Sequence, residues 1–96
     1  MVRSGGEVVV CVRGEIDVAS GPSLWDHLAD AIPETNRLVL DLHDTEFIDS
    51  TALNILVRAL KRLRHGGGDL IIRSPRANAR KVFNMTGLDR VLTIED

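Results

Sequence analysis

The chain has 96 residues, 44% of them apolar and 27% charged, with a net charge of −2, which is the balance of one globular domain. Its single cysteine, Cys11, excludes a disulfide scaffold, and no apolar run reaches the ~18–20 residues of a membrane-spanning helix or marks a signal peptide. The two phenylalanines and one tryptophan are too few to predict a base-stacking surface for single-stranded nucleic acid.

The first part of the chain predicts a strand, a helix and a second strand. Residues 8–12 are a run of valines around Cys11, and we expect a buried strand in which the cysteine acts as a small apolar side chain. Ser20 occupies a helix N-cap position, with a proline two residues later in the first turn, and Pro33 ends the apolar helical spacing. Residues 38–42 form the next strand-like run.

A longer helix is predicted in the middle of the chain. It begins near Asp49 and Ser50, repeats leucine and valine every three or four residues, and ends at the glycines of residues 66–68. Those glycines follow a helix and precede a strand. That is the wrong order for a phosphate-binding loop, so we interpret them as a helix cap and turn.

The remaining residues predict a strand, a short helix and a last strand. Residues 70–72 are apolar, a helix opens at Ser74 or Pro75 and ends at Gly87, and residues 91–94 form a fourth strand-like run. The order β-α-β-α-β-α-β with short connections predicts one α/β domain, with a mainly parallel four-stranded sheet and three helices.

The charges are distributed unevenly along the chain. Residues 1–56 carry a net charge of −7 and residues 57–96 carry +5. The basic half is spread over helix and loop, which argues against direct nucleic-acid binding. We expect a cytoplasmic protein that does not insert into a membrane.

Enzyme and metal motifs are missing from the sequence. The three histidines, His27, His43 and His65, show no metal-ligand spacing, so we expect them on the surface. The chain contains no G-x-S-x-G elbow, Walker A loop or G-x-G-x-x-G fingerprint. We therefore expect no catalytic activity, no metal and no cofactor.

One acidic segment, residues 41–53, precedes and opens the central helix. Its structural interpretation is that Asp49 or Ser50 caps the helix while Phe47 or Ile48 packs onto its apolar face. A serine at a helix N-terminus also carries an exposed hydroxyl near the positive end of the helix dipole. A phosphate there would be attracted by the helix and repelled by nearby acids, which suits a switch. The candidate acids are Asp17, Asp44, Glu46 and Asp49.

Three motifs in this order resemble a STAS domain of the bacterial anti-sigma-factor antagonist type. They are Gly14-Glu15-Ile16-Asp17, Phe47-Ile48-Asp49-Ser50-Thr51-Ala52-Leu53 and Phe83-Asn84-Met85-Thr86-Gly87-Leu88. Together they span nearly the whole chain, and the second is the most specific. The resemblance implies a β/α superhelical fold with a switch serine at the start of the second helix.

The resemblance also implies a function and a set of partners. Ser50 would be phosphorylated by an anti-sigma factor acting as a kinase, and a separate phosphatase would remove the phosphate. The unphosphorylated form would bind that anti-sigma factor and free the sigma factor. We expect the partner-binding residues to be Asp17, Asp44, Asp49, Ser50, Thr51 and Asn54, with Thr51 kept as an alternative phosphate acceptor.

The chain departs from the family pattern in two respects. Ala52 stands where the family usually has glycine, which could affect the close approach of a partner backbone. The family's strand before the first one here, and its helix after the last, are expected to be shortened or absent. An apolar flank near Val91, Leu92 and Ile94 would then be open, which could favour a homodimer.

Two other functions remain as alternatives. The chain could be the STAS component of a lipid or anion transporter, without phosphorylation, whose partner contacts the basic face of the central helix at Arg58, Lys61 and Arg62. A small nucleotide-binding or catalytic domain is the weaker alternative, because no phosphate-binding loop occurs.

Overall fold

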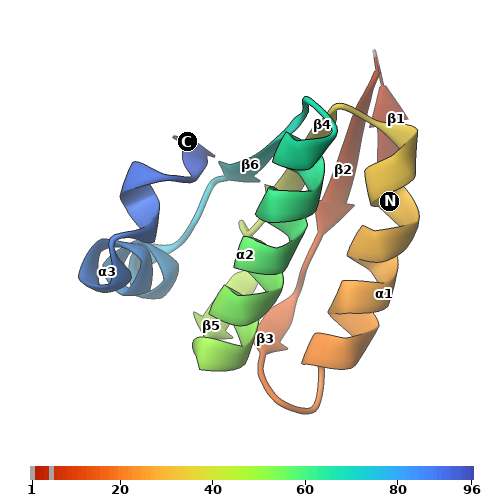
Figure 1. Ribbon diagram of the computed structural model, residues 1–96. Helices are drawn as coiled ribbons and strands as arrows, with labels where there is room; N and C mark the ends of the chain where they lie inside the picture. The colour runs from red at the N-terminus through yellow and green to blue at the C-terminus, as the bar shows by residue number, and fades with distance from the viewer. Residues whose placement is uncertain (1, 5) are drawn as a thin grey trace.

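A five-stranded sheet forms the centre of the computed structural model, which describes residues 2–4 and 6–96 (Figure 1). Its strand order is β1-β2-β4-β6-β7. The strands are β1 (Val2–Ser4), β2 (Glu7–Cys11), β4 (Arg37–Asp41), β6 (Asp69–Arg73) and β7 (Thr93–Glu95). The last four of these are parallel, and β1 pairs with β2 in the antiparallel sense. The predicted parallel four-stranded sheet is confirmed.

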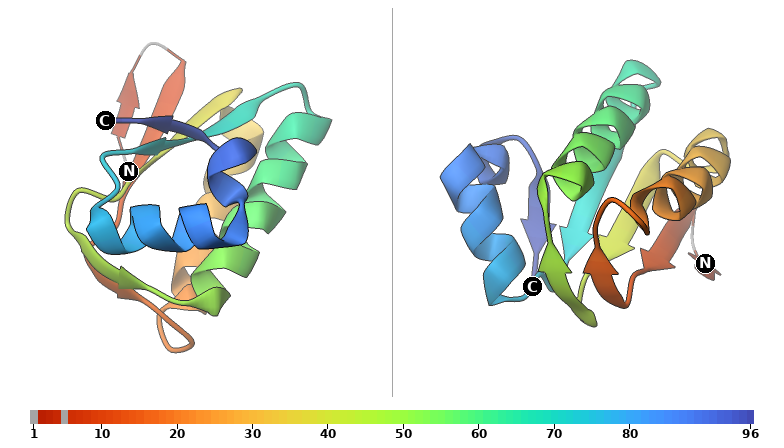
Figure 2. Two further views of the ribbon diagram at one scale, coloured as in Figure 1. Left: turned by 90° about the vertical axis from the view of Figure 1, so that its left-hand side faces the viewer. Right: turned by 90° about the horizontal axis from the view of Figure 1, so that it is seen from below.

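The three predicted helices are also present. They are α1 (Gly21–Ala31), α2 (Ser50–His65) and α3 (Ala77–Thr86), and short 3-10 turns follow the first and third (η1, Ile32–Glu34, and η2, Leu88–Arg90). Helices α1 and α2 lie side by side on one face of the sheet (Figure 1), whereas α3 lies at the side of the domain (Figure 2).

The core lies between that sheet face and helices α1 and α2. Alternate strand residues such as Val8, Leu38 and Leu70 point inward and are at most 2% exposed. They pack in one cluster with Leu28 of α1 and Leu56 of α2, which are fully buried. Helical spacing of the leucines therefore places α2 over the sheet and fixes which of its residues face solvent.

Three strands were missed by the sequence analysis. The first is β1, a three-residue strand that precedes the predicted first strand and pairs with β2, at a place where the family's strand was expected to be shortened or absent. Gly6, just before β2, has a φ of +81°. β3 (Gly14–Ile16) and β5 (Thr45–Ile48) form a second sheet of two parallel strands, and β5 leads directly into α2. These strands are too short for their alternation to stand out.

Two smaller predictions are also corrected. Cys11 is exposed rather than buried, since it falls at the end of β2, on the sheet face that α1 and α2 do not cover. Helix α3 begins at Ala77, with Arg76 at the N-cap position, instead of at Ser74 or Pro75. Of the flank expected to be open, Leu92 is buried and Val91 is 44% exposed.

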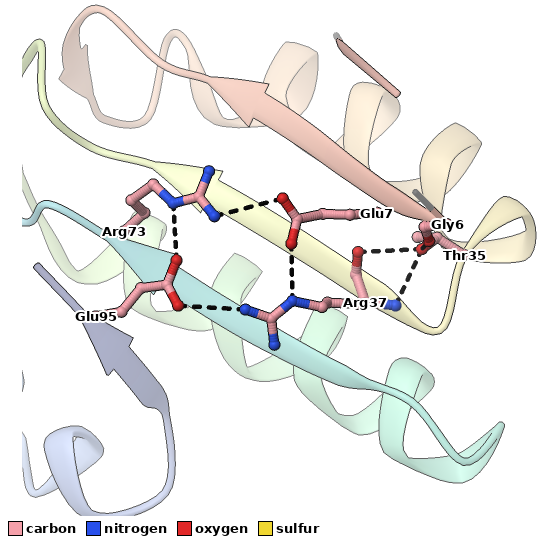
Figure 3. Close-up of polar contacts among 6 residues, drawn as sticks. All are labelled: Gly6, Glu7, Thr35, Arg37, Arg73 and Glu95. Atoms are coloured by element: carbon pink, nitrogen blue, oxygen red, sulfur yellow. Dashed lines mark hydrogen bonds and ion pairs between the residues drawn. The ribbon is translucent and has the colours of Figure 1, made fainter. Parts of the chain in front are cut away.

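The sheet face opposite α1 and α2 carries a ring of four charged side chains, which we call the ion-pair ring (Figure 3). Arg37 donates to Glu7 at 2.8 Å and to Glu95 at 3.2 Å. Arg73 donates to Glu95 at 2.8 Å and to Glu7 at 3.4 Å. The ring joins β2, β4, β6 and β7, and the long stems of its members extend over this otherwise uncovered face.

The ion-pair ring should make the stability of the fold depend on pH. The hydrogen bond from Arg37 is the main cause that holds the pKa of Glu7 below its usual value. The ring therefore stabilises the fold above the ordinary glutamate pKa of about 4.3, and this stabilisation is lost as the pH falls through and below that value. We expect Glu7→Gln to lower the free energy of unfolding at about pH 7 and to have a smaller effect at about pH 3.5.

Urea unfolding at both pH values would measure this difference. Glu46→Gln is the control, because Glu46 is exposed on β5 and makes no ion pair among the described residues. A loss of stability in Glu7→Gln that is the same at both pH values would contradict the role of the ring.

Candidate functional site

The two-stranded sheet brings together two acids that are 32 residues apart in sequence. Ile16 of β3 pairs with Ile48 of β5, so Asp17 and Asp49 each follow the carboxyl end of neighbouring parallel strands. The amide of Asp49 donates to the carbonyl of Ile16 at 3.2 Å. The predicted proximity of Asp17 to the start of the central helix therefore follows from this strand pairing.

The turn from β5 into α2, residues 48–52, is the β5–α2 corner. Asp49 is the N-cap: its backbone is extended, and its carboxylate accepts hydrogen bonds from the amides of Thr51 at 2.8 Å and Ala52 at 3.3 Å. Ile48 is 2% exposed and packs inward, whereas Phe47 is 45% exposed. Of the predicted alternatives, Asp49 is the cap and Ile48 is the residue that anchors the corner to the core.

Ser50 is the first residue of α2 and is exposed. Among the described residues, no side chain or backbone group forms a hydrogen bond with its hydroxyl. Capping is done by the preceding carboxylate, so the serine oxygen is free to react at a helix N-terminus. This geometry is the one the sequence analysis predicted for a modified serine.

A turn holds Asp17 in its charged form. Its carboxylate accepts hydrogen bonds from the amides of Ala19 and Ser20, both at 3.0 Å. These bonds, with the backbone amide of Ser20 as the largest cause, lower the pKa of Asp17. Ser20 occupies the N-cap position of α1, but its hydroxyl accepts from the Asp17 amide and does not cap the helix.

Thr51 differs from Ser50 in its surroundings. It is half-buried where α1 and α2 touch at Gly21. An ideal Cβ on Gly21 would lie 2.8 Å from the methyl carbon of Thr51 and 3.1 Å from the terminal carbon of Ile55. The side chain of Thr51 is therefore part of the helix–helix contact, whereas that of Ser50 is not.

The other predicted partner-binding residues are distributed differently. Asn54 is exposed one helical turn after Ser50, so the two share a face of α2. Asp44 precedes β5 and lies at the end of the strand away from Ser50, where its carboxylate is 3.1 Å from His43 and 3.9 Å from Arg13. Asp49 is five residues after Asp44, and the chain between them is mostly the extended strand β5, so the two are roughly 16 Å apart. The structure does not bring Asp44 to the corner.

Ala52 does not face a partner. Its side chain is fully buried on the inner face of α2. The concern that a methyl group in place of the family's glycine would obstruct a partner backbone is therefore wrong, because the methyl group lies in the core.

A hollow of about 340 Å³ opens between α1 and α2 beside the corner. Trp25 lies at its edge, half-buried, with the guanidinium carbon of Arg58 4.0 Å and that of Arg62 5.0 Å from its ring centre. Trp25 is partly buried and packs against the edge of the core. The hollow is lined by Val18, Gly21, Pro22, Trp25, Asp26, Thr51, Ile55 and Arg58.

Two residues that position the corner were not predicted from the sequence. Gly21 permits the close approach of the two helices, and the side chain of Asn78 accepts a hydrogen bond from the amide of Ile48 at 3.1 Å. Gly21 lies between Ser20 and Pro22 at the predicted helix start, and no role was predicted for it. No local pattern could have indicated Asn78, because its partner is 30 residues away.

Within residues 2–4 and 6–96, no helix has the length and apolar character needed to cross a membrane, and no three or more His, Cys, Asp or Glu side chains are grouped so that they could hold a metal ion. All three histidines are exposed, as predicted.

Comparison with known proteins agrees with the fold and the motifs. The anti-sigma-B factor antagonist of Bacillus subtilis is 31% identical over 92 residues, which cover 96% of this chain and 84% of that protein. A crystal structure from Thermotoga maritima has a TM-score of 0.90 at 27% identity, covering 97% of this chain and 81% of that one. The crystal structure of an anti-sigma factor antagonist from Mycobacterium paratuberculosis has a TM-score of 0.88 at 29% identity, covering 97% of this chain and 80% of that one. The family model of the STAS domain matches residues 1–96, and the chain belongs to this family.

Proposed function

We propose that this protein is an anti-sigma factor antagonist that acts by binding rather than by catalysis. Its relatives of 27–31% identity include proteins named for that activity. The observation that carries the proposal is the β5–α2 corner, where an exposed serine with a free hydroxyl begins a helix beside two carboxylates. The partner is an anti-sigma factor, and its capture in the cytoplasm releases a sigma factor.

Phosphorylation of Ser50 is the proposed control of this binding. A phosphoserine adds about −1.5 to −2 charges at neutral pH. Asp17 and Asp49 already place negative charge at this edge, and the hydrogen bonds to Asp17 keep it ionised. A dianion buried under a partner at this position costs a few kcal/mol of binding free energy unless the partner supplies cations. The anti-sigma factor itself is the proposed kinase, and a phosphatase restores the binding form.

Exposure supports Ser50 over Thr51 as the phosphate acceptor. The methyl group of Thr51 packs against Gly21 and its side chain is half-buried, so Thr51 is less accessible to a kinase than the exposed Ser50. Ser50 makes no such contact and needs no rearrangement.

The partner-binding surface that we propose surrounds the corner. Asp17, Asp49, Ser50, Thr51 and Asn54 lie on it, and the hollow between α1 and α2 adjoins it with apolar side chains that a partner could cover. Asp44 takes part only if the partner also extends along β5.

Phosphorylation in vitro tests this function. The protein would be incubated with ATP and the kinase-like anti-sigma factor encoded nearest its gene, and the modified residue identified by mass spectrometry. We expect one phosphate on Ser50, none in Ser50→Ala, and unchanged modification in Thr51→Val. No phosphate on the wild-type protein, together with binding to transporter subunits, would contradict the proposal and favour the transporter alternative.

A further inference from the structure

The edge of the small sheet next to α3 carries a backbone donor that the sheet cannot satisfy. In the parallel pair β3–β5, the amide of Asp49 points toward β3 and donates to Ile16. Amides alternate in direction along a strand, so the amide of Ile48 points to the opposite edge, where no third strand of the described residues pairs with β5. Ile48 is 2% exposed, and an unpaired amide there would cost free energy.

Helix α3 supplies the missing acceptor. It packs along that edge of β5, and Figure 2 shows β5 between α3 and β3. Asn78, in the first turn of α3, accepts the Ile48 amide through its side-chain oxygen at 3.1 Å. Because an amide N–H can only donate, the oxygen and not the nitrogen of Asn78 must face it.

The hydrogen bond to Asn78 holds the backbone at Ile48, two residues before Ser50. The β5–α2 corner is then held by β3 through Asp49, by α1 through the Gly21–Thr51 contact, and by α3 through Asn78. Of these three, the contact with α3 is the one that includes a side-chain hydrogen bond to the backbone of the corner.

We propose that Asn78 is a positioning residue that fixes where the Ser50 hydroxyl is presented, by anchoring the Ile48 amide to α3. The role rests on the proposed function of Ser50, and it makes the first turn of α3 part of the switch. Loss of the oxygen at residue 78 releases the edge of β5 and lets the first turn of α2 fray. Loss of the amide nitrogen alone has no such effect.

Amide exchange measured by NMR tests the bond without any partner. We expect Asn78→Leu, which removes the acceptor at similar volume, to speed exchange of the Ile48 amide about tenfold or more. Asn78→Asp keeps an acceptor oxygen and should restore slow exchange. Asn84→Ala is the matched control on α3, because that side chain bonds to Asp89 and not to β5. Asn78→Ala replaces the leucine variant if the latter does not fold.

A thiol placed at residue 50 tests the effect on presentation. In a Cys11→Ser background, Ser50→Cys places a thiol at the start of α2, where the helix N-terminus favours the reactive thiolate and the carboxylates of Asp17 and Asp49 disfavour it. Its reaction rate therefore depends on how the first turn of α2 is held. We expect Asn78→Leu to lower its reaction rate with Ellman's reagent at neutral pH about threefold, and Asn78→Asp and Asn84→Ala to leave the rate unchanged.

Unchanged Ile48 exchange or unchanged thiol reactivity in both Asn78→Leu and Asn78→Ala would overturn the positioning role. That result would leave phosphorylation of Ser50 in the wild-type protein untouched. Conversely, a wild-type protein that accepts no phosphate refutes the proposed function, whatever the exchange rates show.

Discussion

Ser50→Asp is expected to weaken binding of the anti-sigma factor by about 30- to 150-fold, whereas Ser50→Ala should keep the wild-type affinity. An aspartate places a permanent negative charge at the start of α2, beside Asp17 and Asp49, and imitates the phosphorylated form. A loss of about 2–3 kcal/mol corresponds to that range of dissociation constants. Titration calorimetry with the purified anti-sigma factor measures both variants directly.

Stability should not account for this difference in affinity. The hydroxyl of Ser50 caps nothing, since Asp49 accepts the amides of Thr51 and Ala52. Ser50→Ala therefore loses no capping bond and gains slightly in helix propensity. Asn36→Asp is a control for added charge, because Asn36 is exposed and directly precedes β4, at the amino ends of the parallel strands and away from Ser50. Equal affinities for the aspartate and alanine variants of Ser50 would exclude the switch.

Gly68→Ala is expected to lower the free energy of unfolding by about 3 kcal/mol, the upper end of the usual range for overpacking. An ideal Cβ on Gly68 would lie 2.5 Å from the carbonyl oxygen of Asn36. That oxygen cannot move aside freely, because it accepts the amide of Asp69 at 2.9 Å and directly precedes β4. The substitution must therefore push apart the starts of β4 and β6.

The two neighbouring glycines are matched controls for this effect. At Gly66 a Cβ would make only ordinary contacts, 3.7 Å or more from the helix carbonyls, so Gly66→Ala should have a small effect. At Gly67 the space is open but φ is +84°, so Gly67→Ala should cost about 1 kcal/mol in backbone strain. Urea unfolding of the three variants would rank them. A loss in Gly68→Ala no larger than in Gly66→Ala would rule out the clash.

The elements that the sequence predicts well are those whose signal is local. Helix α2 has a cap, a long apolar repeat and a glycine end within one segment, so its start and the exposure of Ser50 could be predicted. Strands β3 and β5 are three and four residues long and form a two-stranded sheet, in which Gly14 pairs with Thr45, 31 residues later in the chain. Pairing of this kind depends on the whole fold and leaves no pattern in either segment.

Cys11 shows why composition alone misjudges burial. Its valine neighbours suggested a strand covered on both faces, but both packed helices of this part of the fold lie on one face. Val8 and Val10 point toward them, and Cys11 ends the strand on the side left to solvent. The hydrogen bond between Ile48 and Asn78 could not be predicted either, because a polar residue in the first turn of a helix is ordinarily expected to interact with that helix.

Because the Ser50 hydroxyl forms no hydrogen bond with the described residues, a phosphate could be attached there without reshaping the domain. Attaching a group to the Ser50 oxygen breaks no intramolecular hydrogen bond among the described residues, and the side chains packed beneath α2 keep their places. The modified and unmodified molecules should therefore be almost superimposable, with the difference confined to surface potential. The rate of conversion between the two forms would then be set by the enzymes that add and remove the group, without a slow conformational change in this protein.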